Sequence, residues 1–135
     1  MLETGIRGRQ SVAVTPENTA KTMGSGTLNV FATPALVALA EKTCWMSVAD
    51  ALDEGCGSVG TKLELEHTAP TPVGMTVRAT ATVTGVSENG KLITFRVEAS
   101  DDWGPIGEGT HTRAVIANDR FLQKCNGKLT QAKQK

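Results

Sequence analysis

One stretch decides the fold: VFATPALVALAEKTCWMSVADAL, residues 30–52. Its apolar residues recur every three or four positions, which is the period of an amphipathic helix. Thr33 followed by Pro34 predicts the helix start, with threonine as the capping residue and proline at the first helical position. We predict that the helix runs to about Leu52 and stops near Gly55.

Glu41 interrupts the apolar face of this predicted helix. Helical neighbours lie three and four positions apart, so Glu41 falls in line with Val37, Cys44 and Trp45. A carboxylate on an apolar face is costly unless it is paired or hydrogen-bonded, and burial raises its pKa. Two interpretations remain open: a residue at the rim of a narrow stripe, or a buried catalytic carboxylate. We favour the second.

Strand patterns surround the helix. Alternating apolar and polar residues predict strands at residues 58–68, 75–86, 91–101 and 103–118, and a short first strand at 9–14. Residues 17–29 are polar and glycine-rich, and we expect a lid-like loop there with at most one short turn of helix. This order predicts an α+β fold in which an antiparallel sheet wraps around one long central helix, the hot-dog fold. We expect one domain over residues 1–122 and a polar, lysine-rich tail, 123–135, that frays.

Composition excludes several classes of function. Fourteen basic and fourteen acidic side chains give a formal net charge of zero, which argues against a nucleic-acid binder. No apolar run approaches the roughly 20 residues that span a membrane, and the N-terminus does not resemble a signal peptide. The three cysteines show no metal-ligand spacing, so we expect free thiols and a cytoplasmic location.

Two further residues are candidates for chemistry beside Glu41. His67 shares a strand face with Leu63 and Leu65, and it could either bond a backbone carbonyl or pair with Glu41. Thr33 lies at a helix N-terminus, where free N–H groups and the helix dipole favour developing negative charge. A threonine before proline is also explained by capping alone.

Other motifs give weaker indications of function. His111 and Arg113 share a face of the last strand, and for His111 we favour a solvated or edge-facing position. The glycine-rich EGCGSVGT, residues 54–61, lacks the lysine and the following helix of a phosphate-binding loop. Cys44 sits beside an acid rather than a base, which argues against a nucleophile. Two histidines and scattered carboxylates do not predict a metal site.

Three blocks resemble a known family: VFATPALVALAEKTC, GSVGTKLELEHTAPTPVGMTVRATATV and IGEGTHTRAVI. Together they look like the fluoroacetyl-CoA thioesterase family of hot-dog proteins. The resemblance covers roughly residues 30–121. It implies a homodimer, with a tetramer also open, and hydrolysis of acyl-CoA thioesters without a metal or a cofactor. Coenzyme A enters only as part of the substrate.

The resemblance also implies the site residues. The family's catalytic Thr, Glu and His fall on Thr33, Glu41 and His67, and its acyl-binding glycine and arginine fall on Gly60 and Arg113. Fluoroacetyl-specific members carry a longer, aromatic lid, whereas residues 17–29 contain no aromatic side chain. We therefore expect hydrolysis of a short-chain or small acyl-CoA thioester without specificity for fluoroacetyl. The alternatives are a module that binds acyl-CoA without cleaving it, and a hydratase or dehydratase on the same fold.

Overall fold

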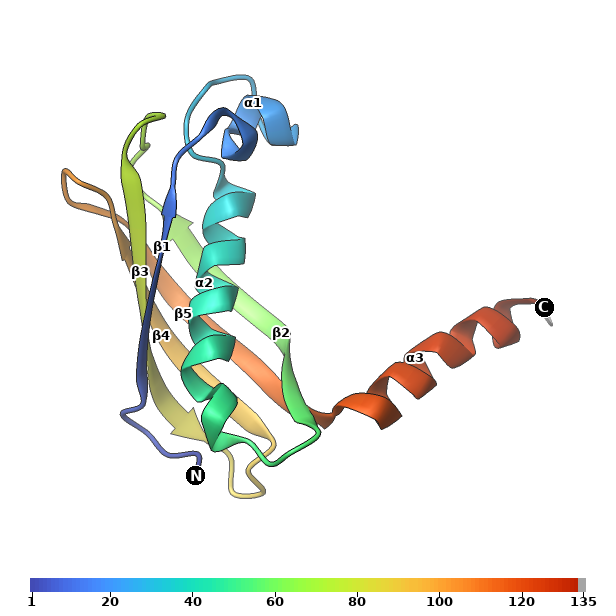
Figure 1. Cartoon of the computed structure of the whole chain (residues 1–135). Coiled ribbons are helices and arrows are strands. Elements are labelled where there is room, and N and C mark those ends of the chain that lie inside the picture. Colours follow the sequence, from blue (N-terminus) through green and yellow to red (C-terminus); the bar gives the residue numbers. More distant parts are fainter. Residues whose placement is uncertain (134–135) are drawn as a thin grey trace.

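The computed structural model describes residues 1–133, with side chains through residue 130. Five strands form one antiparallel sheet: β1 (Arg7–Ala13), β2 (Cys56–His67), β3 (Thr76–Val86), β4 (Leu92–Ser100) and β5 (Pro105–Ala117). Their order in the sheet is β1-β3-β4-β5-β2. The sheet curls around the central helix α2 (Thr33–Val48), which lies in its hollow (Figure 1). The predicted α+β hot-dog fold is confirmed, and each predicted strand lies within two residues of an observed one.

Helix α2 buries one face against the sheet. Its buried residues follow the helical period: Leu36, Leu39, Ala40, Thr43, Cys44 and Val48. Strands β3 and β4 present alternate residues to that face: Val77, Ala79, Ala81, Val83, Ile93, Phe95, Val97 and Ala99. These buried residues are the apolar members of the alternation from which the two strands were predicted. A short 3-10 turn, η2 (Ala49–Ala51), continues the path of α2 close to the predicted end.

The start of α2 differs from the prediction in one residue. Ala32, with φ −75° and ψ 142°, is the capping position, and its carbonyl accepts the Leu36 N–H at 3.0 Å. Thr33 is therefore the first helical residue rather than the cap, and its hydroxyl does not bond the helix backbone. Pro34 still lies in the first turn, where its missing N–H costs nothing.

The segment between β1 and α2 contains two short helices. They are η1 (Pro16–Asn18) and α1 (Ala20–Met23), and Thr19 caps α1 by accepting a hydrogen bond from Thr22 N. Figure 1 shows this segment over the start of α2. It is more regular than the loop predicted for residues 17–29.

The prediction for the C-terminal residues was wrong in part. Helix α3 (Asn118–Lys133) begins directly after β5, so residues 123–133 are helical and the expected boundary at residue 122 falls inside a helix. Asn118 N donates to Gly55 O at 2.9 Å and ties the helix start to the turn before β2. Beyond that first turn α3 projects away from the sheet (Figure 1). Residues 134 and 135 of the predicted tail lie outside the described residues.

Candidate active site

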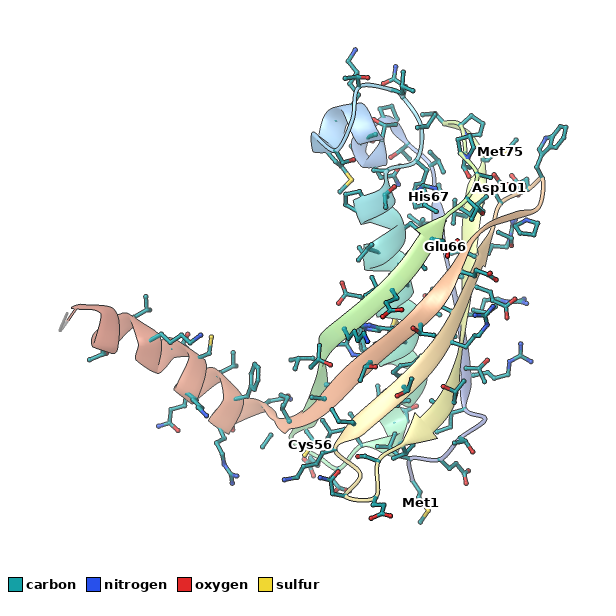
Figure 2. All side chains as sticks on the ribbon, turned by 180° about the vertical axis from the view of Figure 1, so that it is seen from behind. Met1, Cys56, Glu66, His67, Met75 and Asp101 are labelled. Atoms are coloured by element: carbon teal, nitrogen blue, oxygen red, sulfur yellow. The ribbon has the colours of Figure 1, made fainter. Side chains whose placement is uncertain are left out.

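Thr33 and His67 meet at one end of the molecule. Thr33 opens α2 and His67 closes β2, and a hydrogen bond of 2.8 Å joins Thr33 Oγ1 to His67 Nδ1. Figure 2 shows His67 at the upper end of β2, near the start of α2. Both residues line a cavity of about 290 Å³, whose other walls include Phe31 and Pro70. The predicted convergence of this threonine and this histidine on one site is present.

The His67 ring is held in a mostly apolar place. Its edge lies against Phe31, with ring centroids 6.5 Å apart and planes at 81°. Burial lowers the pKa of His67, and a hydrogen bond with the Ala69 backbone partly opposes this change. Nε2 is buried without a hydrogen-bond partner among the described residues. Within one chain the imidazole is therefore neutral near pH 7, and only Nδ1 is engaged.

Glu41 belongs to a second cluster. Its Oε2 lies 3.7 Å from Arg113 Nη1, and its side chain is 42% exposed in the single chain. The expectation of a buried carboxylate was wrong for one chain, because α2 turns Leu39, Ala40 and Cys44 to the core and leaves Glu41 at the rim. Among residues 1–133, no hydrogen bond or ion pair joins Glu41 to His67, so the expected pair is not formed within one chain.

Arg113 is fixed on several sides. Its Nε donates to Ser58 Oγ at 2.8 Å, its Nη2 donates to Ser58 O at 2.8 Å, and its Nη1 lies 3.2 Å from His111 Nε2. Burial lowers the pKa of the guanidinium, and Glu41 opposes this change. The side chain is 6% exposed, so its charge is held inside the protein and directed at the Glu41 carboxylate.

His111 corrects a sequence prediction. It is 2% exposed and stacks on Phe95 with ring centroids 6.2 Å apart, so it is neither solvated nor edge-facing. Its Nδ1 lies 2.8 Å from Lys62 O, and a carbonyl oxygen can only accept, so Nδ1 carries the proton. Nε2 is then free to accept from Arg113. Burial lowers the pKa of His111, which keeps this ring neutral.

Gly60 lies where an added side chain would crowd Glu41 and His111. A Cβ on Gly60 would stand 2.9 Å from Glu41 Oε2 and 3.0 Å from His111 Cε1. The glycine sits on β2 opposite Arg113, next to a register shift between Gly60 and Lys62. The structure thus brings together Gly60, Arg113 and Glu41, three of the five residues predicted for the site.

The two clusters occupy different positions along α2. Thr33 and Glu41 are eight residues apart, which corresponds to about 12 Å along a helix axis. One cluster holds Thr33 and His67, and the other holds Glu41, Gly60 and Arg113.

Sequence reasoning missed Ser58 and the burial of His111. The spacing of His111 two residues before Arg113 was a signal, since both side chains leave the strand on one face.

Cys44 is not suited to nucleophilic chemistry. It is fully buried on α2, and burial raises the pKa of its thiol to about 12. Within residues 1–133, no group of three or more metal-binding side chains lies together, and no helix is both long and apolar enough to cross a membrane.

Comparison with known proteins identifies relatives over most of the chain. The model of the fluoroacetyl-CoA-specific thioesterase (FlK) family matches residues 14–119. The fluoroacetyl-CoA thioesterase of Streptantibioticus cattleyicolor is 44% identical over 102 residues, which are 76% of this chain and 69% of that protein.

Two solved structures share the whole architecture. A structure of the fluoroacetyl-CoA thioesterase FlK superposes with a TM-score of 0.88 at 36% identity, covering 95% of this chain and 98% of that one. A variant of FlK in complex with fluoroacetate and CoA gives a TM-score of 0.82 at 36% identity, covering 89% and 99% of the two chains. Fold and similarity define a thioester hydrolase of the hot-dog class. Within that class, the chain belongs to the fluoroacetyl-CoA-specific thioesterase family.

Proposed function

We propose that the protein hydrolyses acyl-CoA thioesters that carry a small acyl group, with Thr33, His67 and Glu41 as its catalytic residues. The observation that carries this proposal is the 2.8 Å hydrogen bond between Thr33 Oγ1 and His67 Nδ1 at the start of α2. A hydroxyl and a neutral imidazole are joined there beside a helix N-terminus, in a cavity open to a ligand.

The start of α2 suits the charge that develops during hydrolysis. When a nucleophile adds to a thioester carbonyl, its oxygen becomes an oxyanion. The first turn of a helix has backbone N–H groups without intrahelical partners, and the dipole is positive at that end. Donors fixed in place before the reaction stabilise an oxyanion far better than mobile water does. The Thr33 hydroxyl can contribute one such donor, and His67 holds it in position.

Glu41 has two possible chemical roles. It can attack the carbonyl carbon and form an acyl anhydride that water then opens, or it can accept a proton from water that attacks directly. In both routes the C–S bond breaks, the CoA thiolate leaves and takes a proton, and the acid is released. His67 can carry that proton. Arg113 holds the Glu41 carboxylate in place, because its guanidinium Nη1 lies 3.7 Å from Glu41 Oε2.

A homodimer completes this site. In one chain Glu41 and the Thr33–His67 pair lie about two helical turns apart. Strand β2 is an edge of the sheet and carries His67 at one end and Gly60, beside Glu41, nearer its middle. Antiparallel pairing of β2 with a second copy would bring one chain's His67 end toward the other chain's Glu41 cluster. We place the thioester between the two.

The acyl group is small but is not restricted to fluoroacetyl. The lid segment, residues 17–29, contains no aromatic side chain, and its larger apolar side chains, Met23 and Leu28, are exposed. The Thr33–His67 cavity of about 290 Å³ lies beneath this segment. We expect acetyl-, propionyl- and butyryl-CoA to be hydrolysed, with fluoroacetyl-CoA giving no more than about a tenfold advantage over acetyl-CoA.

A hydrolysis assay tests the proposal. Release of free CoA thiol is measured on short acyl-CoA substrates with the wild type, Thr33→Ala and Glu41→Gln. We expect each substitution to lower kcat by about 10²-fold or more, as removal of an acid–base group or an oxyanion donor does elsewhere. Wild-type turnover by Glu41→Gln on the best substrate would show that the assigned mechanism is wrong. Val37→Ala, on the same face of α2, controls for disturbance of the helix.

A further inference from the structure

A second cavity begins at the Glu41 cluster and reaches helix α3. It has a volume of about 570 Å³ and lies between the end of α2, the start of β2 and the first turn of α3. Arg113 and Ser58 form its inner wall, and Trp45, Phe121 and Leu122 form its outer wall. Trp45 follows Glu41 by one helical turn. In Figure 2, Cys56 marks the start of β2, beside the base of α3.

Helix α3 carries its cations on one stripe. Arg120, Lys124 and Lys128 are spaced by four residues, so their side chains follow one another along a single side of the helix. All three are exposed, and none forms an ion pair among the side chains described through residue 130. Asp119 is the one acidic residue of α3. The helix is therefore basic, although the whole chain has no net charge.

The cation stripe borders the mouth of the cavity. Phe121, which lines the cavity, is followed at three and seven positions by Lys124 and Lys128, so the side chains of these lysines lie on the same side of the helix as Phe121. Lys124 and Lys128 lie about 4.5 and 10.5 Å beyond Phe121 along the axis, whereas Arg120 lies about 100° around the helix from Phe121. An apolar channel leads outward from Arg113 to a row of positive charges.

An acyl-CoA has the complementary distribution of properties. Its thioester end is uncharged, its pantetheine arm is long and partly apolar, and its diphosphate and 3′-phosphate carry several negative charges. We propose that this cavity holds the pantetheine arm between Trp45 and Phe121, and that Lys124 and Lys128 bind the phosphates. This inference rests on the proposed function. It assigns α3 as the part of the enzyme that distinguishes CoA thioesters from thioesters without a nucleotide.

The experiment compares a CoA thioester with a truncated one. Acetyl-CoA and the acetyl thioester of N-acetylcysteamine share the reacting group, but only the first has phosphates. We define discrimination as the ratio of the two kcat/KM values. In the double variant Lys124→Glu, Lys128→Glu we expect discrimination to fall at least about tenfold, because each charge-assisted contact to phosphate is lost and replaced by repulsion. In the wild type, added NaCl should lower discrimination as well.

A matched variant changes the same charge elsewhere. Arg7→Glu, Arg9→Glu reverses two exposed cations on β1, the sheet edge opposite β2, and should leave discrimination within about twofold of the wild type. An unchanged ratio in the α3 variant would overturn the inference. So would an equal loss on both substrates with a change of molecular mass in light scattering, since α3 would then hold a second copy of the chain.

A binding measurement separates this inference from the proposed function. Calorimetric titration with CoA itself needs no turnover, and the α3 variant should bind CoA at least about tenfold more weakly than the wild type and the matched variant do. A wild type that binds CoA but hydrolyses neither thioester would overturn the function and support the assignment of α3. Equal CoA affinity in all three proteins would overturn the assignment, whatever the hydrolysis assay gives.

Discussion

Gly60 sets the distance between the Glu41 carboxylate and the Arg113–His111 pair. A methyl group there would stand 2.9 Å from Glu41 Oε2, closer than real Cβ atoms approach, and 3.0 Å from His111 Cε1, which is a tight contact. Glu41 can move, since it lies at the rim of the helix, but His111 is buried and cannot. The cost of an added methyl therefore falls on the position of the carboxylate.

We predict that Gly60→Ala lowers kcat/KM by roughly 10- to 100-fold, because a displacement of about 1 Å at a reacting group costs this much. Thermal stability should change far less. Gly85→Ala is the matched control: it is also a strand glycine at a register shift, and its added Cβ would meet only Thr94 Cβ, at 3.9 Å. Equal activity of the two variants in the acyl-CoA assay would contradict this role of Gly60.

His111 couples the site to pH through stability. Burial lowers the pKa of His111 in the folded chain below its usual 6.5, while Lys62 O partly opposes this and Arg113 adds to it. Below pH 6.5 the unfolded chain therefore binds a proton at this position that the folded chain does not bind. The stability that neutral His111 provides is complete above pH 6.5 and declines as the pH falls toward the folded pKa.

The comparison with His111→Gln measures this decline, because glutamine does not titrate. We expect the difference in unfolding free energy, wild type minus variant, to shrink by at most about 1.4 kcal/mol per pH unit as the pH falls below 6.5. Urea denaturation of both proteins at pH 7.5, 6.5 and 5.5 gives the difference directly. A difference that stays constant with pH would mean that His111 is not held neutral.

Sequence reasoning located site residues better than it described their environments. Thr33 and His67 were chosen from their places on a helix and a strand, and the structure joins them. The capping role of Thr33 was wrong because Ala32 already supplies the extended dihedrals and the first carbonyl. The burial of His111 depends on its pairing with Phe95 across β4 and β5. That register is a long-range contact, which alternation along one strand does not reveal.

At the scale of elements, β1 and α2 approach closely because of Gly8. A Cβ on Gly8 would stand 2.6 Å from Ser47 Cβ and 3.1 Å from the Thr43 carbonyl oxygen. Thr43 and Ser47 both bond the helix backbone behind them, at 2.7 and 2.6 Å. The helix surface at this point is therefore rigid, and only a glycine on β1 leaves room for it.

We predict that Gly8→Ala destabilises the fold by about 1–3 kcal/mol, as overpacking of a close contact does. The midpoint of urea unfolding should fall, and acyl-CoA hydrolysis below the transition should persist, since Gly8 contacts α2 on the side away from Glu41. Gly85→Ala again provides the strand-glycine control. An unchanged midpoint for Gly8→Ala would show that β1 can shift away from α2 at little cost.

The elements with strong periodicity were predicted well, and α3 was not. Alternation in β3 and β4 records burial on one face of the sheet, so it is visible in the sequence. Helix α3 packs only its first turn on the body and leaves Leu122 and Leu129 exposed. Its few apolar residues, Phe121, Leu122, Cys125 and Leu129, do follow a helical period, but the polar, lysine-rich composition around them suggested a frayed tail.

At the scale of the whole molecule, the proposed catalytic residues lie in two separate clusters of the chain. Thr33 and His67 lie at one end of α2 and β2, and Glu41 lies about two turns away with Arg113. A two-fold dimer through β2 would make two complete sites, each with Thr33 and His67 from one chain and Glu41 from the other. This arrangement makes a prediction that no within-chain site makes.

Mixing two inactive variants should restore activity. In a heterodimer of Thr33→Ala and Glu41→Gln chains, one site carries both changes and the other carries neither. After random exchange of subunits, half of the dimers are heterodimers, and each heterodimer has one intact site out of two. About a quarter of wild-type turnover should therefore return. Thr33→Ala mixed with His67→Ala is the matched control. One chain contributes both Thr33 and His67 to a site, so every site of the heterodimer carries one of the two changes, and no activity should return. Recovery in neither mixture, with subunit exchange verified by two affinity tags, would place the whole reaction within one chain.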